Sequence, residues 1–412
     1  MMKKLILFAL CCLALLANAY ELKKITTPLK IDGRAEKLWQ TAPILKLVKW
    51  RSNKAAPLMP STVRFLYDDV NLYCLAEFTE NNLNEALMQS VKYTRRDAPT
   101  YQNDCCELFL DPFMDGNRCF QFVVDVHGCE ADLLHGDPKN YRDPAHWNGF
   151  WRSAVHYAEE MWSIEYAIPW QTIGIAPGKE RQVAIDLSRS RRCNPPERSV
   201  IVDTRLLRTT PEFIRLTADP DPLPASGRLE HGALFTGRNQ LQVIIRNDAP
   251  EVLHGTLTVS GNYTSGTPAF MEKSPVMLPV GKLLKQNVSF SVAQPGALNI
   301  TAELALDKAG TVFIGSANAN VQPPFDINDP HPMVLQGEKW GIYLRSFTPG
   351  AKNVESLIRQ NGKLAAGKNH GSLQGKNFIT LPTEKLLPGK YSLRIAVGND
   401  HIDLPLTVIA RP

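Results

Sequence analysis

Short runs of alternating apolar and polar residues recur along this chain of 412 residues. Residues 162–168 (WSIEYAI) carry an apolar side chain at every second position, and residues 255–260 (GTLTVS) and 287–292 (NVSFSV) alternate in the same way. Such alternation predicts β-strands with one buried face. Turn residues separate the runs at near-regular spacing, which is typical of immunoglobulin-like sandwiches. We therefore predict an all-β protein.

Three regions can be separated along the chain. Residues 20–231 hold six of the seven tryptophans and all cysteines after position 19, and a proline-rich stretch, residues 219–224, lies near their end. A Pro323-Pro324 pair marks the second junction. We predict an N-terminal β-sandwich over residues 20–231, followed by two smaller immunoglobulin-like β-sandwiches over 232–322 and 323–412. Four tryptophans fall at apolar positions of the pattern and are expected in the core, namely Trp39, Trp151, Trp162 and Trp170.

The first nineteen residues have the composition of a secretory signal peptide. Lys3 and Lys4 precede an apolar run over residues 5–16, and Ala17-Asn18-Ala19 forms an A-x-A cleavage site. The apolar run is too short to span a bilayer. The alternative is a buried N-terminal helix. We expect removal of the peptide near Ala19 and a secreted, periplasmic or cell-envelope protein of bacterial type, with no transmembrane segment.

Six cysteines remain after position 19, namely Cys74, Cys105, Cys106, Cys119, Cys129 and Cys193. An even number of cysteines in an exported domain allows disulfides, and buried free thiols on strands are the alternative. Neither is favoured over the other. No pair has the C-x-x-C spacing of a zinc site. The formal net charge of +5 is spread along the chain without a basic block, so no nucleic-acid partner is indicated.

The common sequence motifs of catalysis are absent. The chain has no H-E-x-x-H, G-x-S-x-G or P-loop sequence. Glu107 and Asp111 share one predicted strand, where four residues separate them by about 13 Å, a spacing that fits neither glycosidase geometry. His127, His135 and His146 lack metal-ligand spacing and are interpreted as solvated loop residues. We predict a protein that is not an enzyme.

Five segments in order resemble family 9 carbohydrate-binding modules. They are residues 31–39 (IDGRAEKLW), 65–78 (FLYDDVNLYCLAEF), 101–111 (YQNDCCELFLD), 161–170 (MWSIEYAIPW) and 227–230 (GRLE), the last resembling the closing strand. The fourth segment lacks the glycine that usually precedes the tryptophan. The resemblance covers nearly all of the first region. It implies a β-sandwich that binds sugars, often near chain ends, without cleaving them.

The resemblance also implies a set of sugar-binding residues. Tyr101 occupies the place of a stacking tryptophan, Glu107 that of a glutamate that accepts sugar hydroxyls, and Gln121 that of an arginine in some members. The second stacking tryptophan of the family is missing from residues 216–226. Two alternatives follow: either the site stacks a sugar on one side only, or Trp147 substitutes for the missing tryptophan. The full set implied for the site is Tyr101, Asn103, Glu107, Gln121, Trp147 and Arg189.

Calcium is a further expectation, because exported sandwiches often bind it in oxygen-rich turns. The candidate ligands are Asp68, Asp69 and Asp104, and no other cofactor is indicated. The leading hypothesis is an exported carbohydrate-binding protein whose partner is a poly- or oligosaccharide and whose C-terminal domains contact other proteins. The alternatives are a structural or interaction protein of the cell envelope that keeps the sandwich without binding sugar, and an accessory chain of a carbohydrate-degrading complex.

Overall fold

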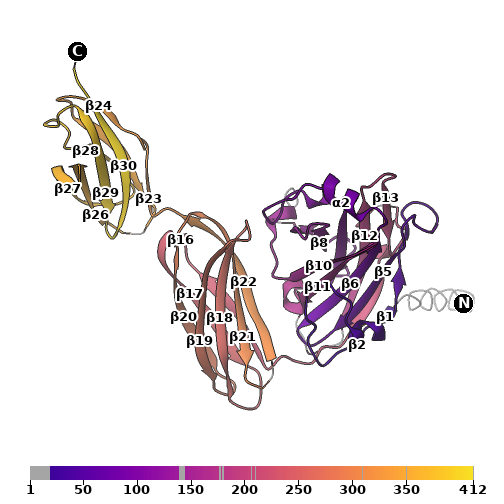
Figure 1. Cartoon of the computed structure of the whole chain (residues 1–412). Coiled ribbons are helices and arrows are strands. Elements are labelled where there is room, and N and C mark those ends of the chain that lie inside the picture. Colours follow the sequence, from indigo (N-terminus) through magenta and orange to yellow (C-terminus); the bar gives the residue numbers. More distant parts are fainter. Residues whose placement is uncertain are drawn as a thin grey trace, which may run out of the picture. The chain divides into compact units, whose positions relative to one another are not determined.

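The protein is almost entirely built of β-strands, which form six sheets in the described part of the chain (Figure 1). The computed structural model describes residues 19–138, 144–175, 178, 181–205, 207–208, 210–308, 310–348 and 350–411. The predicted signal peptide lies outside these residues apart from Ala19. None of the helices in this described part has both the length and the apolar character needed to cross a membrane. The all-β prediction is confirmed.

The N-terminal sandwich consists of two sheets. The larger has the order β1 (Ala19–Glu21), β14 (Ile214–Ala218), β12 (Arg181–Arg191), β7 (Cys105–Asp111), β8 (Cys119–Asp125) and β9 (Glu130–His135), with β13 (Glu197–Val200) pairing β12 and β4 (Val48–Lys49) pairing β13. The smaller has the order β10 (Arg152–Ala158), β11 (Met161–Pro169), β6 (Asn71–Thr79), β5 (Ser61–Tyr67) and β2 (Lys23–Lys24), with β3 (Leu45–Lys46) pairing β5. The helical segments are η1 (Lys37–Thr41), α2 (Leu83–Gln89), η2 (Thr100–Gln102), η3 (Pro144–His146), η4 (Trp170–Ile173) and η5 (Thr210–Glu212).

Strand alternation decides which side chains fill the core of this sandwich. On β7, Cys106, Leu108 and Leu110 belong to the main apolar cluster between the sheets. Glu107, one residue away, therefore has its side chain on the opposite, outer face of the sheet. The four tryptophans predicted to be internal are all buried, with exposed fractions of 1% for Trp39, 3% for Trp151, 0% for Trp162 and 1% for Trp170.

A buried carboxylate on β11 ties the start of the sandwich to its smaller sheet. Glu165 accepts hydrogen bonds from the backbone amides of Asp32 (2.9 Å) and Gly33 (2.8 Å) and from Trp39 Nε1 (2.8 Å). Gly33 has φ +81°, and a Cβ there would lie 2.6 Å from the backbone nitrogen of His156, so only glycine fits. Two segments of the family resemblance, residues 31–39 and 161–170, thus meet at one carboxylate.

The six described cysteines are free thiols, and all except Cys129 are buried. The structure therefore favours the buried-thiol alternative over disulfides. Burial raises the pKa of Cys106 and of Cys119 to about 12. Both thiols are accordingly protonated and unreactive at neutral pH, because the thiolate is the nucleophile.

The second sandwich pairs a three-stranded sheet with a five-stranded one. The first is β15 (Ala225–His231), β17 (Gly237–Asn247) and β20 (Leu283–Val292) in that order. The second is β16 (Leu234–Phe235), β22 (Gly310–Gln322), β21 (Gly296–Leu306), β18 (Leu253–Tyr263) and β19 (Pro268–Leu278).

The third sandwich repeats this connectivity strand for strand. Its sheets are β23 (Phe325–Ile327), β25 (Trp340–Ser346) and β28 (Lys376–Leu381), then β24 (Met333–Leu335), β30 (Asp400–Ile409), β29 (Gly389–Val397), β26 (Lys352–Gln360) and β27 (Lys363–Leu373). In both sandwiches the second strand pairs in parallel with the last one. The two C-terminal domains therefore share one topology, although no repeat is evident in their sequences.

The boundary between the first two domains differs from the prediction. Residues 227–230 were expected to close the N-terminal sandwich, yet they lie in β15, which pairs antiparallel with β17. The same connectivity in the third domain begins with β23, the counterpart of β15. The second sandwich therefore begins near Ala225 rather than at residue 232.

Candidate functional site

The outer face of the larger N-terminal sheet carries a cluster of polar side chains. On β7 this face presents Glu107, which lies directly across from Ser188 of β12 and Val123 of β8. The neighbouring outward position of β8 is Gln121, which pairs with Phe109. The same face also carries two small clusters of buried apolar side chains, one around Phe109 and one around Val123. The polar groups therefore lie beside hydrophobic neighbours.

Glu107 is the centre of this cluster and is itself almost covered, with 4% exposure. Gln121 Nε2 donates to its Oε2 at 2.7 Å, and Ser190 Oγ donates to its Oε1 at 3.2 Å. Arg198 Nη2 lies 3.1 Å from the same Oε1. The predicted proximity of Glu107 and Gln121 is thus present in the structure. Glu107 holds three polar side chains in fixed orientations, one of them charged.

A chain of directed hydrogen bonds extends from Gln121 across β9. His135 Nε2 lies 2.6 Å from Gln121 Oε1, and Arg208 Nη1 lies 2.8 Å from His135 Nδ1. A guanidinium can only donate, so Nδ1 is the acceptor and Nε2 carries the proton that is donated to Gln121. Burial, together with the positive charge of Arg208, lowers the pKa of His135 to about 4. His135 is therefore neutral at physiological pH, which keeps this direction of donation.

Trp50 places an aromatic ring beside the cluster. It follows β4 and donates from Nε1 to the carbonyl of Thr204 at 3.0 Å. The Arg198 guanidinium carbon lies 5.8 Å from the centroid of its ring, within the range of a cation–π contact. Arg198 therefore links the carboxylate of Glu107 to the face of Trp50. Its side chain is 23% exposed, which makes it the accessible charged group of the cluster.

Tyr101 is the predicted site residue that is open to solvent, with 53% exposure. It lies in η2, four residues before the start of β7. Arg192, just beyond the end of β12, donates from Nη2 to the Tyr101 carbonyl at 2.6 Å. Tyr101 is thus fixed beside the ends of β7 and β12, and its ring can take part in stacking.

Asn103 has a structural role instead of the predicted contact with sugar. Its Oδ1 accepts from the Val91 amide (2.9 Å), and its Nδ2 donates to the Val91 carbonyl (2.8 Å) and to Asp125 Oδ2 (2.7 Å). It is 4% exposed. The side-chain amide of Asn103 thus makes its hydrogen bonds to the backbone of Val91 and to Asp125 at the end of β8.

Arg189 and Trp147 do not join the outer face, which corrects two expectations. Arg189 pairs with the inward-facing Cys106, is 1% exposed, and donates to Glu80 Oε2 at 2.8 Å. Trp147 packs on Phe120, with ring centroids 4.6 Å apart, and Phe120 belongs to the core. Both side chains lie on the inner side of the larger sheet, so neither can contribute to a sugar site around Glu107 on the outer face.

The aspartates proposed as calcium ligands at the hairpin turn already have protein partners. Asp68 Oδ1 accepts from two backbone amides of its own turn, at 2.8 and 2.6 Å, and its Oδ2 accepts from Tyr73 Oη at 2.7 Å. Asp69 pairs with Lys24 at 2.6 Å. These contacts define a capped turn and leave no converging set of oxygen ligands.

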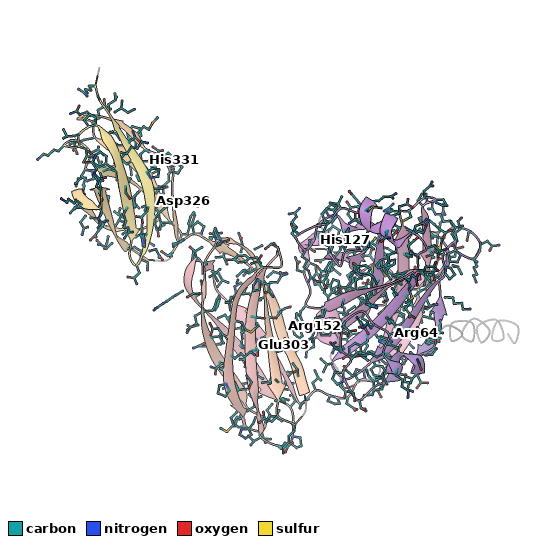
Figure 2. The ribbon with its side chains drawn as sticks, in the orientation of Figure 1. Arg64, His127, Arg152, Glu303, Asp326 and His331 are labelled. Carbon is teal, nitrogen blue, oxygen red and sulfur yellow. The ribbon has the colours of Figure 1, made fainter. Side chains whose placement is uncertain are left out.

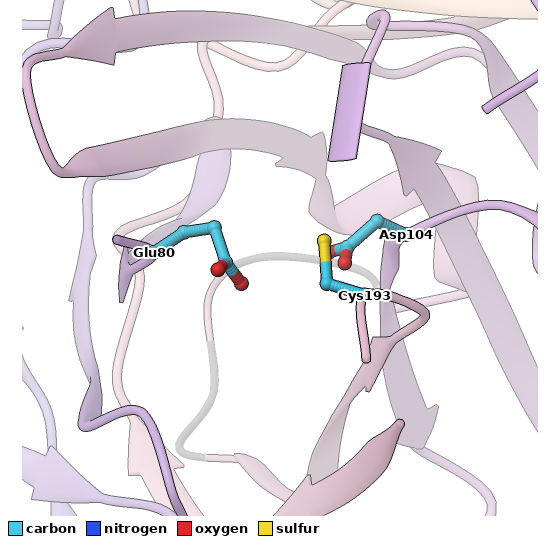
Figure 3. Close-up of side chains that lie close together, drawn as sticks. All are labelled: Glu80, Asp104 and Cys193. Carbon is cyan, nitrogen blue, oxygen red and sulfur yellow. The ribbon is translucent and has the colours of Figure 1, made fainter. Parts of the chain in front are cut away.

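Asp104, the third calcium candidate, lies with Glu80 and Cys193 in a buried cluster (Figure 3). One ligand atom of each residue lies within 4.8 Å of the others. Both oxygens of Glu80 accept from arginines, Oε2 at 2.8 Å from Arg189 and Oε1 at 3.0 Å from Arg191. Burial raises the pKa of Asp104 to about 6. A sulfur atom and two neutralising guanidiniums do not fit the oxygen ligands that calcium requires.

The sequence reasoning missed Trp50, Ser190, His135 and Arg198. His135 was interpreted as a loop residue, although it ends β9 opposite Cys119. Arg198 reaches Glu107 because β13 pairs β12. The alternation of residues 130–135 is weak, and no local signal indicates which distant strands pair. Trp50 could have been noticed as a tryptophan outside any long apolar run.

The N-terminal domain is thus a β-sandwich with a polar cluster on the outer face of its larger sheet. Residues 31–198 match the family described as "Carbohydrate family 9 binding domain-like". The match covers less than half of the chain and confirms the resemblance seen in the sequence of the first region.

Two curated proteins, both named as enzymes, match a part of this chain. The chain is 24% identical over 148 residues to "Exoglucanase XynX" of Acetivibrio thermocellus, a match that covers 36% of this chain and 12% of the relative. It is 25% identical over 159 residues to "Endo-1,4-beta-xylanase A" of Thermoanaerobacterium saccharolyticum, covering 38% of this chain and 12% of the relative. The matched segment therefore spans about an eighth of each relative.

A solved structure of a candidate carbohydrate-binding protein from Bacteroides uniformis aligns with 48% of this chain and 98% of its own. The sequence identity is 12% and the TM-score is 0.38, which is too low to establish a shared fold.

Proposed function

We propose that this chain is an exported, non-catalytic protein that binds a glycan end through the outer face of its N-terminal sandwich. The match of residues 31–198 to a carbohydrate-binding family supports sugar recognition. The N-terminal sequence, with Lys3, Lys4 and the Ala17-Asn18-Ala19 site, supports export. The two C-terminal sandwiches would serve as spacers or as surfaces for partner proteins.

The observation that carries the proposal is the fixed polar cluster around Glu107. A pyranose needs an aromatic ring for its C–H face and preset donors and acceptors for its hydroxyls. Tyr101 offers an exposed ring and Arg198 an accessible guanidinium. Glu107 has two roles in the proposal: it orients Arg198 and Gln121, and it accepts a hydroxyl where the ligand approaches.

The names of the relatives suggest the ligand class. Enzymes named exoglucanase and endo-1,4-β-xylanase carry related domains, so β-1,4-linked glucan and xylan oligosaccharides are the first ligands to test. Both are neutral, which suits a site whose single carboxylate is already balanced by an arginine.

The test is calorimetric titration of the full chain with cello- and xylo-oligosaccharides, each with a free or a chemically reduced end. Glu107→Gln removes a charged acceptor while keeping its shape, and such hydrogen bonds contribute about 1.5–3 kcal/mol. We expect a loss of affinity of roughly 10- to 100-fold, and a similar loss for Tyr101→Ala. Glu159→Gln, an exposed carboxylate of the β10–β11 turn, is the matched control and should bind normally.

A scaffold that has lost sugar binding is the second candidate, and the coverage of Glu107 favours it. With 4% exposure and partners on both oxygens, this carboxylate resembles a structural anchor. The scaffold hypothesis predicts no heat of binding for any oligosaccharide of a broad panel, and Glu107→Gln then changes stability alone. Retention of wild-type affinity in folded Glu107→Gln and Tyr101→Ala variants would reject the proposed site.

A further inference from the structure

The C-terminal sandwich exposes an aromatic pair on the outer face of its three-stranded sheet. Ile342 and Leu344 of β25 are in the core, so Tyr343 between them faces outward. Tyr343 lies directly across from Phe378 of β28, and the ring centroids are 5.1 Å apart. Tyr343 is 47% exposed and Phe378 60%. Two large rings are thus side by side and open to solvent.

Gly341 allows the Phe378 ring to lie close to the sheet. A Cβ at Gly341 would be 2.1 Å from Cζ of that ring. The ring therefore covers the backbone of the central strand β25, and any larger residue at this position would push it away. One face of Phe378 is supported by the sheet, which leaves the other face for a ligand.

Two cations occupy the next outward positions of the same two strands. Arg345 of β25 lies directly across from Lys376 of β28. Like charges in directly opposed positions destabilise a sheet. Lys376 Nζ is 4.8 Å from the Tyr343 ring centroid, and the Arg345 guanidinium carbon is 4.9 Å from the ring of Phe347. Within the described residues neither cation forms an ion pair. Asp326 of β23, which Figure 2 labels, is the register partner of Arg345 on the other side of β25.

We propose that this face, formed by Tyr343, Phe378, Arg345 and Lys376, is a second glycan-binding site that takes an acidic polysaccharide containing uronic acids. The C–H face of a pyranose stacks on the aromatic pair. The cations stand about 7 Å further along the strands, where they can pair with the carboxylate of the stacked sugar or of the next one. An anion between Arg345 and Lys376 would reduce the repulsion between these two side chains further than Asp326, across from Arg345 alone, can do.

The choice of a polysaccharide over another polyanion rests on the proposed function of the N-terminal domain. The site itself stands on its own residues, which belong to a different sandwich from Glu107. The two proposals can therefore fail independently.

Affinity electrophoresis of the full chain at pH 8, in native gels with polygalacturonate or neutral xylan, tests this site. Tyr343→Leu/Phe378→Leu removes the rings but keeps apolar volume, and Arg345→Gln/Lys376→Gln removes the charges. Each pair should weaken retardation by polygalacturonate at least tenfold. Lys385→Gln/Lys390→Gln removes the same charge from exposed positions outside this face and should have no effect. Glu107→Gln should also leave this retardation unchanged.

Several outcomes would overturn the inference. One is no retardation of the wild type by polygalacturonate. Another is equal weakening by the control pair, which would indicate unspecific attraction between charges. Loss of retardation in Glu107→Gln would assign the acidic ligand to the N-terminal domain. Retardation by DNA as strong as by polygalacturonate, unaffected by loss of the rings, would indicate a general polyanion surface.

Discussion

Replacement of Glu165 by alanine should strongly destabilise the N-terminal sandwich. This carboxylate accepts three hydrogen bonds from donors that lie at least 126 residues earlier in the chain. The donors are the amides of Asp32 (2.9 Å) and Gly33 (2.8 Å) and the indole N–H of Trp39 (2.8 Å). Glu165 is fully buried. Alanine would leave the amide of Gly33 and the indole N–H of Trp39 without partners in a closed environment, and water could not replace the carboxylate without opening the fold.

The expected magnitude follows from these three contacts. Each donor left without a partner costs about 1–3 kcal/mol, with the part-buried amide of Asp32 at the low end, so the gross loss is roughly 3–7 kcal/mol. Burial raises the pKa of Glu165, which shows that the wild type already bears a desolvation cost that alanine removes. We therefore expect a net loss of roughly 3–6 kcal/mol. Glu165→Gln keeps one oxygen for the two backbone amides and turns its NH2 toward Trp39, which should cost roughly 1–3 kcal/mol.

Urea unfolding of the full chain, followed by tryptophan fluorescence, measures this difference. Six of the seven tryptophans lie before residue 171, so the signal reports mainly the N-terminal sandwich. Glu159→Ala, at an exposed turn, should stay within about 0.5 kcal/mol of the wild type. A loss below about 1 kcal/mol in Glu165→Ala, or an equal loss in the glutamine and alanine variants, would refute the reasoning.

Two further variants test buried charges in the same domain by the same assay. Arg189→Met removes a buried partner of Glu80 and should cost about 3–5 kcal/mol, whereas a loss below about 1 kcal/mol would contradict a stabilising role of the pair. Burial raises the pKa of Asp186 to about 7, so its contribution to stability is fully present below the unfolded-state pKa of about 4 and is lost as the pH rises through 7. Asp186→Asn should make the fall of stability between about pH 4 and 7 smaller, with other buried carboxyls such as Asp97 and Asp104 contributing the remainder, and an unchanged slope would count against the assignment.

Strands with clear alternation could be predicted from the sequence. Residues 255–260 and 287–292 lie in β18 and β20, where buried and more exposed positions alternate. Alternation works there because one face of each strand is buried and the turn residues fix the register. The identical strand order of the two C-terminal domains could not be predicted. A strand order is defined by which strands pair, and the two domains reach the same order with sequences that show no repeat.

The site was predictable only where neighbouring positions of one hairpin form it. Glu107 and Gln121 lie on adjacent strands joined by one turn, and they do meet. Arg189 was placed on the wrong face, although the sequence held a usable signal. Leu187, two residues earlier, is an apolar core residue, and residues two apart on a strand share a face. Arg198 reaches Glu107 because β12, the neighbour of β13 in the chain, pairs with the distant strand β7, and a single sequence does not reveal that pairing. His135 ends β9, which forms a local hairpin with β8, but the weak alternation of residues 130–135 does not indicate a strand.

The family signature of this domain consists mostly of residues that hold the sandwich together. Gly33 and Trp39 bind Glu165, and Asp68 and Asp111 each accept backbone amides that close a hairpin turn. These positions stabilise the fold. The side chains that contact Glu107, by contrast, come from β8, β12 and β13, at positions outside the five segments of the resemblance. A family match therefore indicates the architecture, and under the proposed function the choice of sugar depends also on side chains outside these segments.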